Sequence, residues 1–172
     1  SVAKEKGLQP LAAFILDQNA TEDVLVEAAK YLSDAEGKEV KTAEEALQGA
    51  KDIIAEQISD EADYRTFIRD LTMQEGAIKS TAKDAEVKSV YENYYDFEEK
   101  ISKSAGHRVL ALNRGEKEKI LTVKIMAPEE RITGYLQKQI ITANNPFTTP
   151  ILEEVVLDAY DRLIAPAIER EV

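Results

Sequence analysis

The sequence predicts a mainly all-α protein, a bundle-like array of several helices with one short β element near residues 119–127. Apolar residues recur at helical spacing through most of the 172 residues. The chain has only 7 glycines and 5 prolines to interrupt them. The segment Ile120–Met126 is the one clear stretch that is β-branched and alternating, which is typical of a strand.

Residues 8–74 predict four helices. The first spans Leu8 to Gln18, and Thr21 is expected to cap the second, which runs to about Leu32. These two form either an ordinary helical hairpin or a helix-turn-helix, and the hairpin is the commoner arrangement. Thr42 and Glu45 have the spacing of a capping box. They open the most amphipathic helix, whose apolar stripe comprises Ala43, Ala46, Leu47, Ala50, Ile53, Ile54 and Ile58. The fourth helix starts near Asp60 and ends near Gln74.

The segments before the strand carry weaker patterns. Residues 77–85 have no strong period and predict a loop or a weak strand. Residues 86–100 place valines and aromatic residues mostly at helical spacing, so we expect a helix there. Residues 104–114 predict a further helix, with Asn113–Gly115 as its turn or C-terminal cap.

Two helices are expected after the strand. Pro128 begins one that reaches about Ile141. Thr149 then caps a long helix with Pro150 at its first position, where a missing N–H costs nothing. Pro166 is expected to kink or end this last helix, because its ring clashes one turn back.

The whole chain, 1–172, is expected to form one helical segment of a longer protein, or two sub-bundles, 1–76 and 77–172. It begins with Ser1 and not Met, and its last residues look helical without a stop signal. Cysteine is absent, so disulfides and thiolate sites are excluded and a cytoplasmic location is the default expectation. No apolar run approaches the length of a membrane span, and we expect no membrane partner.

The net charge of −11 disfavours a stand-alone nucleic-acid binder, because an acidic surface repels phosphates. The stretch from Lys100 to Lys124 departs from this average, because its only acidic residues are Glu116 and Glu118. A solvated surface is the more common origin of such a stretch, and a phosphate-facing patch is the functional alternative. The candidate nucleic-acid-binding residues are Lys100, Lys103, Arg108, Arg114, Lys117, Lys119 and Lys124.

No catalytic constellation is apparent in the sequence. His107 is the single histidine, and no metal-binding His spacing, phosphate loop or nucleophile motif accompanies it. The many carboxylates occur as adjacent pairs such as Glu98 and Glu99, whose side chains diverge on a helix. We therefore expect no catalytic residue, no metal and no cofactor, and treat a carboxylate-based enzyme as a remote alternative.

Four stretches, residues 3–12, 43–56, 107–118 and 158–171, together resemble the N-terminal region of bacterial Tex proteins, the transcription accessory family with an S1-type RNA-binding domain. The most specific of them read AEEALQGAKDIIAE (43–56) and HRVLALNRGEKE (107–118). The resemblance covers essentially the whole chain. It implies a mostly helical body with a helix-turn-helix element whose position in residues 1–172 it does not define.

The resemblance also implies a function. Family members continue with RNase H-like, helix-hairpin-helix and OB-fold domains, all outside residues 1–172, and their nucleic-acid binding rests largely on those domains. The expected role is thus a non-catalytic scaffold that docks on the RNase H-like domain and assists contact with nucleic acid or the transcription machinery. Such docking predicts an exposed apolar strip on the last helix. The alternative is an independent protein-protein interaction domain of an unrelated family.

Overall fold

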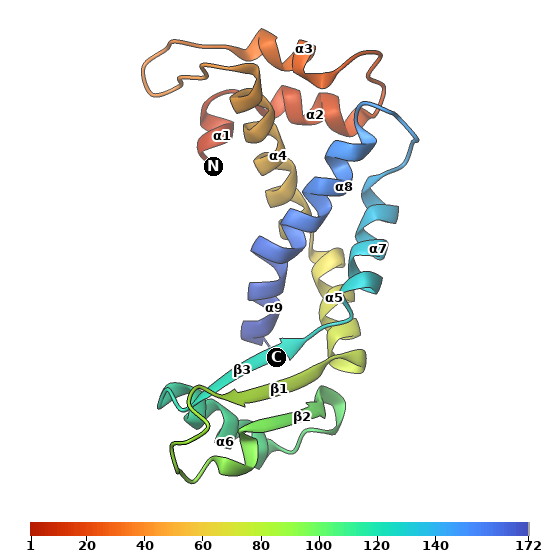
Figure 1. Ribbon diagram of the computed structural model, residues 1–172. Helices are drawn as coiled ribbons and strands as arrows, with labels where there is room; N and C mark the ends of the chain where they lie inside the picture. Colours follow the sequence, from red (N-terminus) through yellow and green to blue (C-terminus); the bar gives the residue numbers. More distant parts are fainter. Residues whose placement is uncertain (172) are drawn as a thin grey trace. The chain divides into compact units, whose positions relative to one another are not determined.

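The computed structural model describes residues 1–171, which form two compact units. Unit 1 comprises residues 1–65 and 131–167, and unit 2 comprises residues 66–130 and 168–172. The chain therefore leaves unit 1 and returns to it, which differs from a division at residue 76. Figure 1 shows the elements of each unit in sequence colours.

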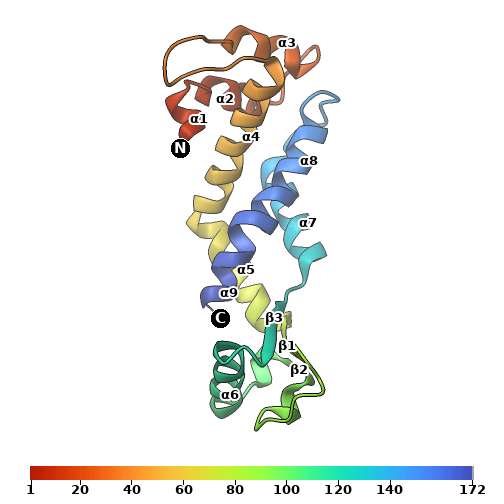
Figure 2. The same ribbon diagram turned by 60° about the vertical axis from the view of Figure 1, so that its left-hand side comes forward.

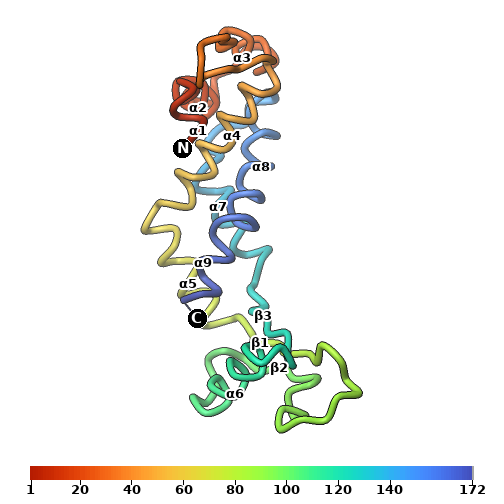
Figure 3. Tube along the Cα trace, turned by 90° about the vertical axis from the view of Figure 1, so that its left-hand side faces the viewer, coloured from red at the N-terminus to blue at the C-terminus, as the bar shows by residue number. Residues whose placement is uncertain are grey.

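Unit 1 is helical and is organised around α4 (Ala43–Asp60). Figures 2 and 3 show the short N-terminal helices gathered near the first half of α4. Its core is fully buried and is formed by aliphatic side chains that include Leu11, Ile15, Ile53, Ile54, Ile132, Leu136, Leu152 and Ile164. The helices with most of their length in unit 1 are α1 (Val2–Glu5), α2 (Gln9–Asp17), α3 (Val24–Ala28), α4, α7 (Glu129–Ile140) and α8 (Thr149–Asp158).

The predicted Thr42 cap of α4 is present, but the Glu45 side chain reaches one residue further back than in a capping box. The Thr42 hydroxyl accepts a hydrogen bond from the Glu45 N–H at 3.1 Å, and the Glu45 carboxylate accepts one from the Lys41 N–H at 2.9 Å. Thr21, by contrast, is not a cap. Asp23 caps α3 by accepting from the Leu25 N–H at 2.8 Å, and a 3₁₀ turn (Ala29–Tyr31) follows. The reason is that the acidic side chain two residues further along reaches the orphan N–H.

The last helix continues through Pro166. A π-helical segment (Ala159–Ile164) follows α8, and α9 (Ala165–Glu171) contains the proline. Proline lacks an N–H and its ring crowds the carbonyl of Arg162, so the wider turn before it accommodates both effects. The N-cap position of α8 is Thr148 and not Thr149, and the Thr148 side chain forms no capping hydrogen bond; Pro150 is therefore the second residue of the helix and not the first.

Unit 2 contains a three-stranded antiparallel sheet in the order β2-β1-β3. Its strands are β1 (Ala77–Ala82), β2 (Asp96–Lys100) and β3 (Leu121–Met126). Helix α6 (Gly106–Lys117) packs on one face. Helix α5 (Ala62–Glu75) leads into β1, with the division between the units falling inside it.

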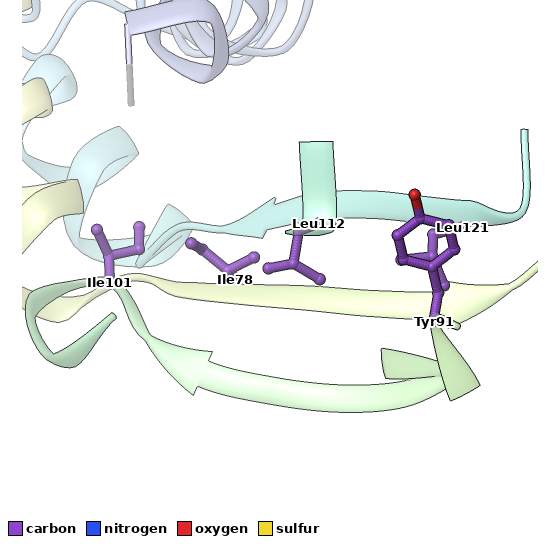
Figure 4. Packing of buried hydrophobic residues seen from close by; sticks show 5 residues of the cluster. All are labelled: Ile78, Tyr91, Ile101, Leu112 and Leu121. Atoms are coloured by element: carbon purple, nitrogen blue, oxygen red, sulfur yellow. The ribbon is translucent and has the colours of Figure 1, made fainter. Parts of the chain in front are cut away.

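The core of unit 2 lies between the sheet and α6. Figure 4 shows the buried side chains Ile78, Leu112 and Leu121 in a row, with Tyr91 and Ile101 at its two ends. The rings of Tyr94 and Phe97 meet edge to face, with centroids 5.2 Å apart, and pack against this row. These aromatic side chains therefore stabilise the small core instead of standing free for bases.

The mainly helical fold class and the strand near residues 119–127 are confirmed, but the sheet has two further strands. The expected helix over residues 86–100 is wrong. It is replaced by turns, a 3₁₀ turn (Glu92–Tyr94) and β2. This segment is not helical because it forms hydrogen bonds with a distant strand. The Ser80 hydroxyl donates to the Tyr94 carbonyl at 2.7 Å, and the Ala82 N–H donates to the Tyr95 carbonyl at 2.9 Å.

The expected turn at Asn113–Gly115 is also wrong, because α6 continues to Lys117. Gly115 serves close packing instead. A Cβ atom there would lie 2.4 Å from Cδ1 of the fully buried Leu121, so only glycine lets α6 approach β3.

Candidate nucleic-acid interface

The seven candidate basic residues all belong to unit 2, but different elements carry them. Six are exposed and Arg108 is partly buried. Lys100 ends β2, Lys103 lies in the 3₁₀ turn Ile101–Lys103, and Lys124 lies in β3. Arg108, Arg114 and Lys117 belong to α6, and Lys119 lies in the turn between α6 and β3 with a φ of 62°. The structure thus divides the set over two sides of the sheet.

Lys100 and Lys124 lie on the face of the sheet that α6 leaves open. Neighbours across strands share a face, and alternate residues switch faces. Ile78 and Leu121 face α6, so Lys79, one residue on, faces the other way together with its register partner Lys124. The open face also carries Glu98 and Asp96, which oppose Lys79 and Thr81 from β2.

Arg114 and Lys117 lie on the outer side of α6. Leu112 and Gly115 are its buried positions, and helical geometry turns residues 114 and 117 well away from them. Lys119 follows in the left-handed turn, where its N–H donates to the Glu116 carbonyl at 3.0 Å. This second group is mixed in charge, because the exposed Glu116 and Glu118 are interleaved with it.

Arg108 is engaged within the unit. Its guanidinium forms an ion pair and hydrogen bond with the Glu99 carboxylate of β2, and the Ser104 hydroxyl donates to the same carboxylate at 3.3 Å. A phosphate at Arg108 would have to compete with this local carboxylate. Arg108 therefore secures α6 to the sheet better than it serves as a phosphate contact.

The Tyr91 side chain contacts Glu118, the residue that follows α6. A hydrogen bond to Glu118, with burial as a second cause, raises the pKa of the Tyr91 hydroxyl. Glu118 thus lies at the end of α6 among the basic residues of this second group, where a carboxylate weakens the attraction for phosphate.

The charge of the molecule is distributed unevenly between the units. Unit 1 has 10 basic and 19 acidic residues, which gives it a net charge of −9. Unit 2 has 12 basic and 14 acidic residues, a net charge of −2. The electrostatic objection to nucleic-acid binding therefore applies mainly to unit 1.

His107 is exposed on α6. Within residues 1–171, no group of three or more His, Cys, Asp or Glu side chains is arranged to hold a metal ion. Several carboxylates have structural partners: Glu154 pairs with Lys51 at 3.0 Å, and Asp158 pairs with Arg162 at 3.0 Å. In the same described range, no helix has both the length and the apolar character of a membrane span.

The last helix does not show the expected apolar strip. In α9, Ala167 and Ile168 are buried, and the exposed residues are Glu169, Arg170 and Glu171. In the preceding α8, Leu157 is exposed by 47%. Apolar docking through this helix is therefore not supported.

Residues 19–172 match a family model described as Tex central region-like. The chain is 52% identical over its whole length to an uncharacterized protein of Bacillus subtilis, YdcI, of which it covers 24%. It is 34% identical to Protein tex of Bordetella pertussis, with 72% of the chain and 16% of that protein aligned. It is 32% identical to the transcriptional accessory protein Tex of Neisseria gonorrhoeae, again over 72% of the chain and 16% of that protein.

The chain thus spans about a quarter or less of the length of these relatives. The matching model is described as a central region, whereas the sequence resemblance was assigned to the N-terminal region of such proteins. A family match over most of the chain excludes the alternative of an unrelated helical domain. This chain belongs to the Tex family.

Proposed function

We propose that the chain is a non-catalytic helical scaffold and interaction module of a cytoplasmic transcription accessory protein, and that unit 2 assists its contact with nucleic acid. The observation that carries this proposal is that unit 2 is nearly neutral and bears exposed lysines, whereas unit 1 is strongly acidic. The names of the relatives point in the same direction: one is a transcriptional accessory protein Tex, and another is a human S1 RNA-binding domain-containing protein, 27% identical over 98% of the chain.

A scaffold role fits the way the polar residues are used. The best-placed carboxylates cap helices or pair with nearby cations, as Asp23 and Asp158 do. Docking on an RNase H-like domain is part of the proposal. Because α9 exposes Glu169, Arg170 and Glu171, such a contact through this helix would be polar.

The test is binding of single-stranded RNA and DNA by the 172-residue chain over a salt series, beside the variant R114E/K117E/K119E. The proposal predicts binding that weakens as salt rises, because released counterions dominate such contacts. Loss of binding in the variant would assign the contact to the end of α6. Absence of binding even at low salt would refute the nucleic-acid part of the proposal and leave a protein scaffold.

A further inference from the structure

We propose that the open face of β1 and β3, centred on Lys79 and Lys124, binds the phosphodiester backbone of single-stranded nucleic acid. This inference rests on the proposed nucleic-acid role of unit 2 and assigns it to a surface. Lys79 is outside the basic stretch of the sequence, and only the sheet brings it beside Lys124.

Two like charges stand directly opposite each other on this face. Lys79 and Lys124 are register partners in the antiparallel pair, and both are exposed. Cβ atoms of such partners lie about 4.5–5.5 Å apart, where like charges destabilise a sheet. Among the described residues, neither lysine forms an ion pair. Glu98 of β2 opposes Lys79 from the other side, whereas the register partner of Lys124 is Lys79 alone, so a further anion can offset the repulsion. An anionic ligand between the two ammonium groups would do so.

The next positions on the same strands suit the same ligand. Thr81 and Thr122 are register partners beside the lysine pair, and their hydroxyls are hydrogen-bond donors for phosphate oxygens. On the other side, Ala77 opposes Met126, which adds small and apolar surface without charge. The half of the face formed by β1 and β3 therefore carries no acidic residue, and the acids Asp96 and Glu98 are confined to β2.

The chemistry favours the backbone of the nucleic acid over its bases. Base stacking needs exposed rings. Tyr94 and Phe97 pack instead against the core on the α6 side of the sheet. Lysine and threonine contacts to phosphates position a strand without reading its sequence.

The sheet face differs from the end of α6 in where its acidic residues lie. There, Arg114, Lys117 and Lys119 alternate with Glu116 and Glu118 along the chain. On β1 and β3 the neighbours of the lysines are threonines, alanine and methionine. The acids of this face lie on β2, where Glu98 opposes Lys79, so the field of Lys124 on the far strand β3 is less cancelled than that of Lys79.

The test measures fluorescence anisotropy of a labelled single-stranded RNA of mixed sequence, with single-stranded DNA and duplex DNA as further probes, using the 172-residue chain. The variant K79E/K124E is compared with K38E/K138E, which makes the same charge change at exposed lysines of unit 1. The inference predicts that K79E/K124E weakens single-strand binding by roughly tenfold or more and reduces the salt slope by about one for each lysine. K38E/K138E should change affinity by no more than about twofold.

Two further variants keep the result interpretable. K79Q/K124Q removes the charges without placing an acid opposite Glu98, and circular dichroism checks that each variant is folded. K79R/K124R should retain binding. If K79E/K124E and K79Q/K124Q bind as tightly as K38E/K138E while R114E/K117E/K119E loses binding, the sheet-face inference is overturned and the proposed function stands. If the unaltered chain binds no probe, both fail. Tighter binding of duplex than of single strands would overturn the choice of ligand.

Discussion

At the scale of a single residue, Gln18 joins distant segments of unit 1. It is buried, with 4% exposed, and has the left-handed φ of 57° at the end of α2. Its Nε2 donates to the Ile140 carbonyl at 3.0 Å, and its Oε1 accepts from the N–H groups of Thr142 and Ala143 at 3.0 and 3.1 Å. One side chain thus fixes the end of α7 against the end of α2.

Replacing Gln18 with leucine should lower the free energy of unfolding by about 1–3 kcal/mol, because several polar groups lose their partner. Urea unfolding followed by circular dichroism measures this. Gln57→Leu, at an exposed position of α4, is the matched control and should have little effect. Equal effects of the two substitutions would show that the hydrogen bonds of Gln18 contribute nothing specific.

Gly115 and Gly134 form a second contrast. Both lie inside helices, α6 and α7, but a Cβ at Gly115 would clash with Leu121 whereas one at Gly134 would meet nothing within 4 Å. Gly134→Ala should stabilise by up to about 1 kcal/mol through helix propensity. Gly115→Ala should destabilise by about 1–2 kcal/mol net, because overpacking exceeds that gain. Thermal unfolding of both variants decides the point, and a stabilising Gly115→Ala would contradict the packing of α6 on β3.

Tyr64 and Tyr135 predict a pH dependence. Their rings meet edge to face with centroids 6.0 Å apart, and burial is the main cause that raises the pKa of both hydroxyls, with Glu61 and Asp63 adding to it. A raised folded-state pKa stabilises the fold fully below the unfolded value of about 10, and this contribution is lost as pH rises through the folded pKa. The free energy of unfolding should therefore fall above about pH 10.

The measurement is urea unfolding at several alkaline pH values, with absorbance near 295 nm reporting tyrosinate formation. The double variant Y64F/Y135F should show a smaller alkaline loss of stability. A loss of the same size in the double variant would mean that other groups cause it.

At the scale of elements, local patterns predicted those helices and strands whose determinants are close in sequence. The helix α4 followed from its apolar stripe and Thr42 cap, and β3 from its alternation. Strand β2 did not follow, and β1 was expected only as a weak strand or a loop, because the stability of both comes from pairing across the chain, such as Ser80 with Phe97. The available signal was an alternation along β1, in which Ile78 and Ser80 are buried and Lys79 and Thr81 are exposed.

The same limit applies to the candidate site. The basic stretch was visible as a run in the sequence, but its distribution over the open sheet face and the outer side of α6 depends on register and helix phase. Lys79 was missed because it lies more than twenty residues before the basic stretch and only strand pairing brings it beside Lys124. Gln18 was missed because the carbonyl that it binds lies 122 residues away.

The cap of α4 is a prediction at this scale. Thr42→Ala removes the hydroxyl that accepts from the Glu45 N–H, and should lower the free energy of unfolding by about 1 kcal/mol. Thr42→Ser retains the oxygen and should lose less. Guanidinium unfolding of the two variants measures the difference, and identical losses would indicate that the methyl group of Thr42, not its hydroxyl, matters.

At the scale of the whole molecule, the two units differ in net charge. The acidic surface belongs mainly to unit 1, with its net charge of −9, and unit 2 is close to neutral at −2. Such a division lets one part of a chain approach phosphates while another repels them and keeps the protein soluble. We therefore expect nucleic acid to contact unit 2 alone.

The most direct test is an NMR titration of the ¹⁵N-labelled 172-residue chain with a short single-stranded RNA at low salt. The account predicts chemical-shift changes confined to residues 66–130, largest along β1 and β3 around Lys79 and Lys124, and reversed by added salt. Changes centred on α4 and α8 of unit 1, or no changes with RNA in large molar excess at low salt, would contradict it.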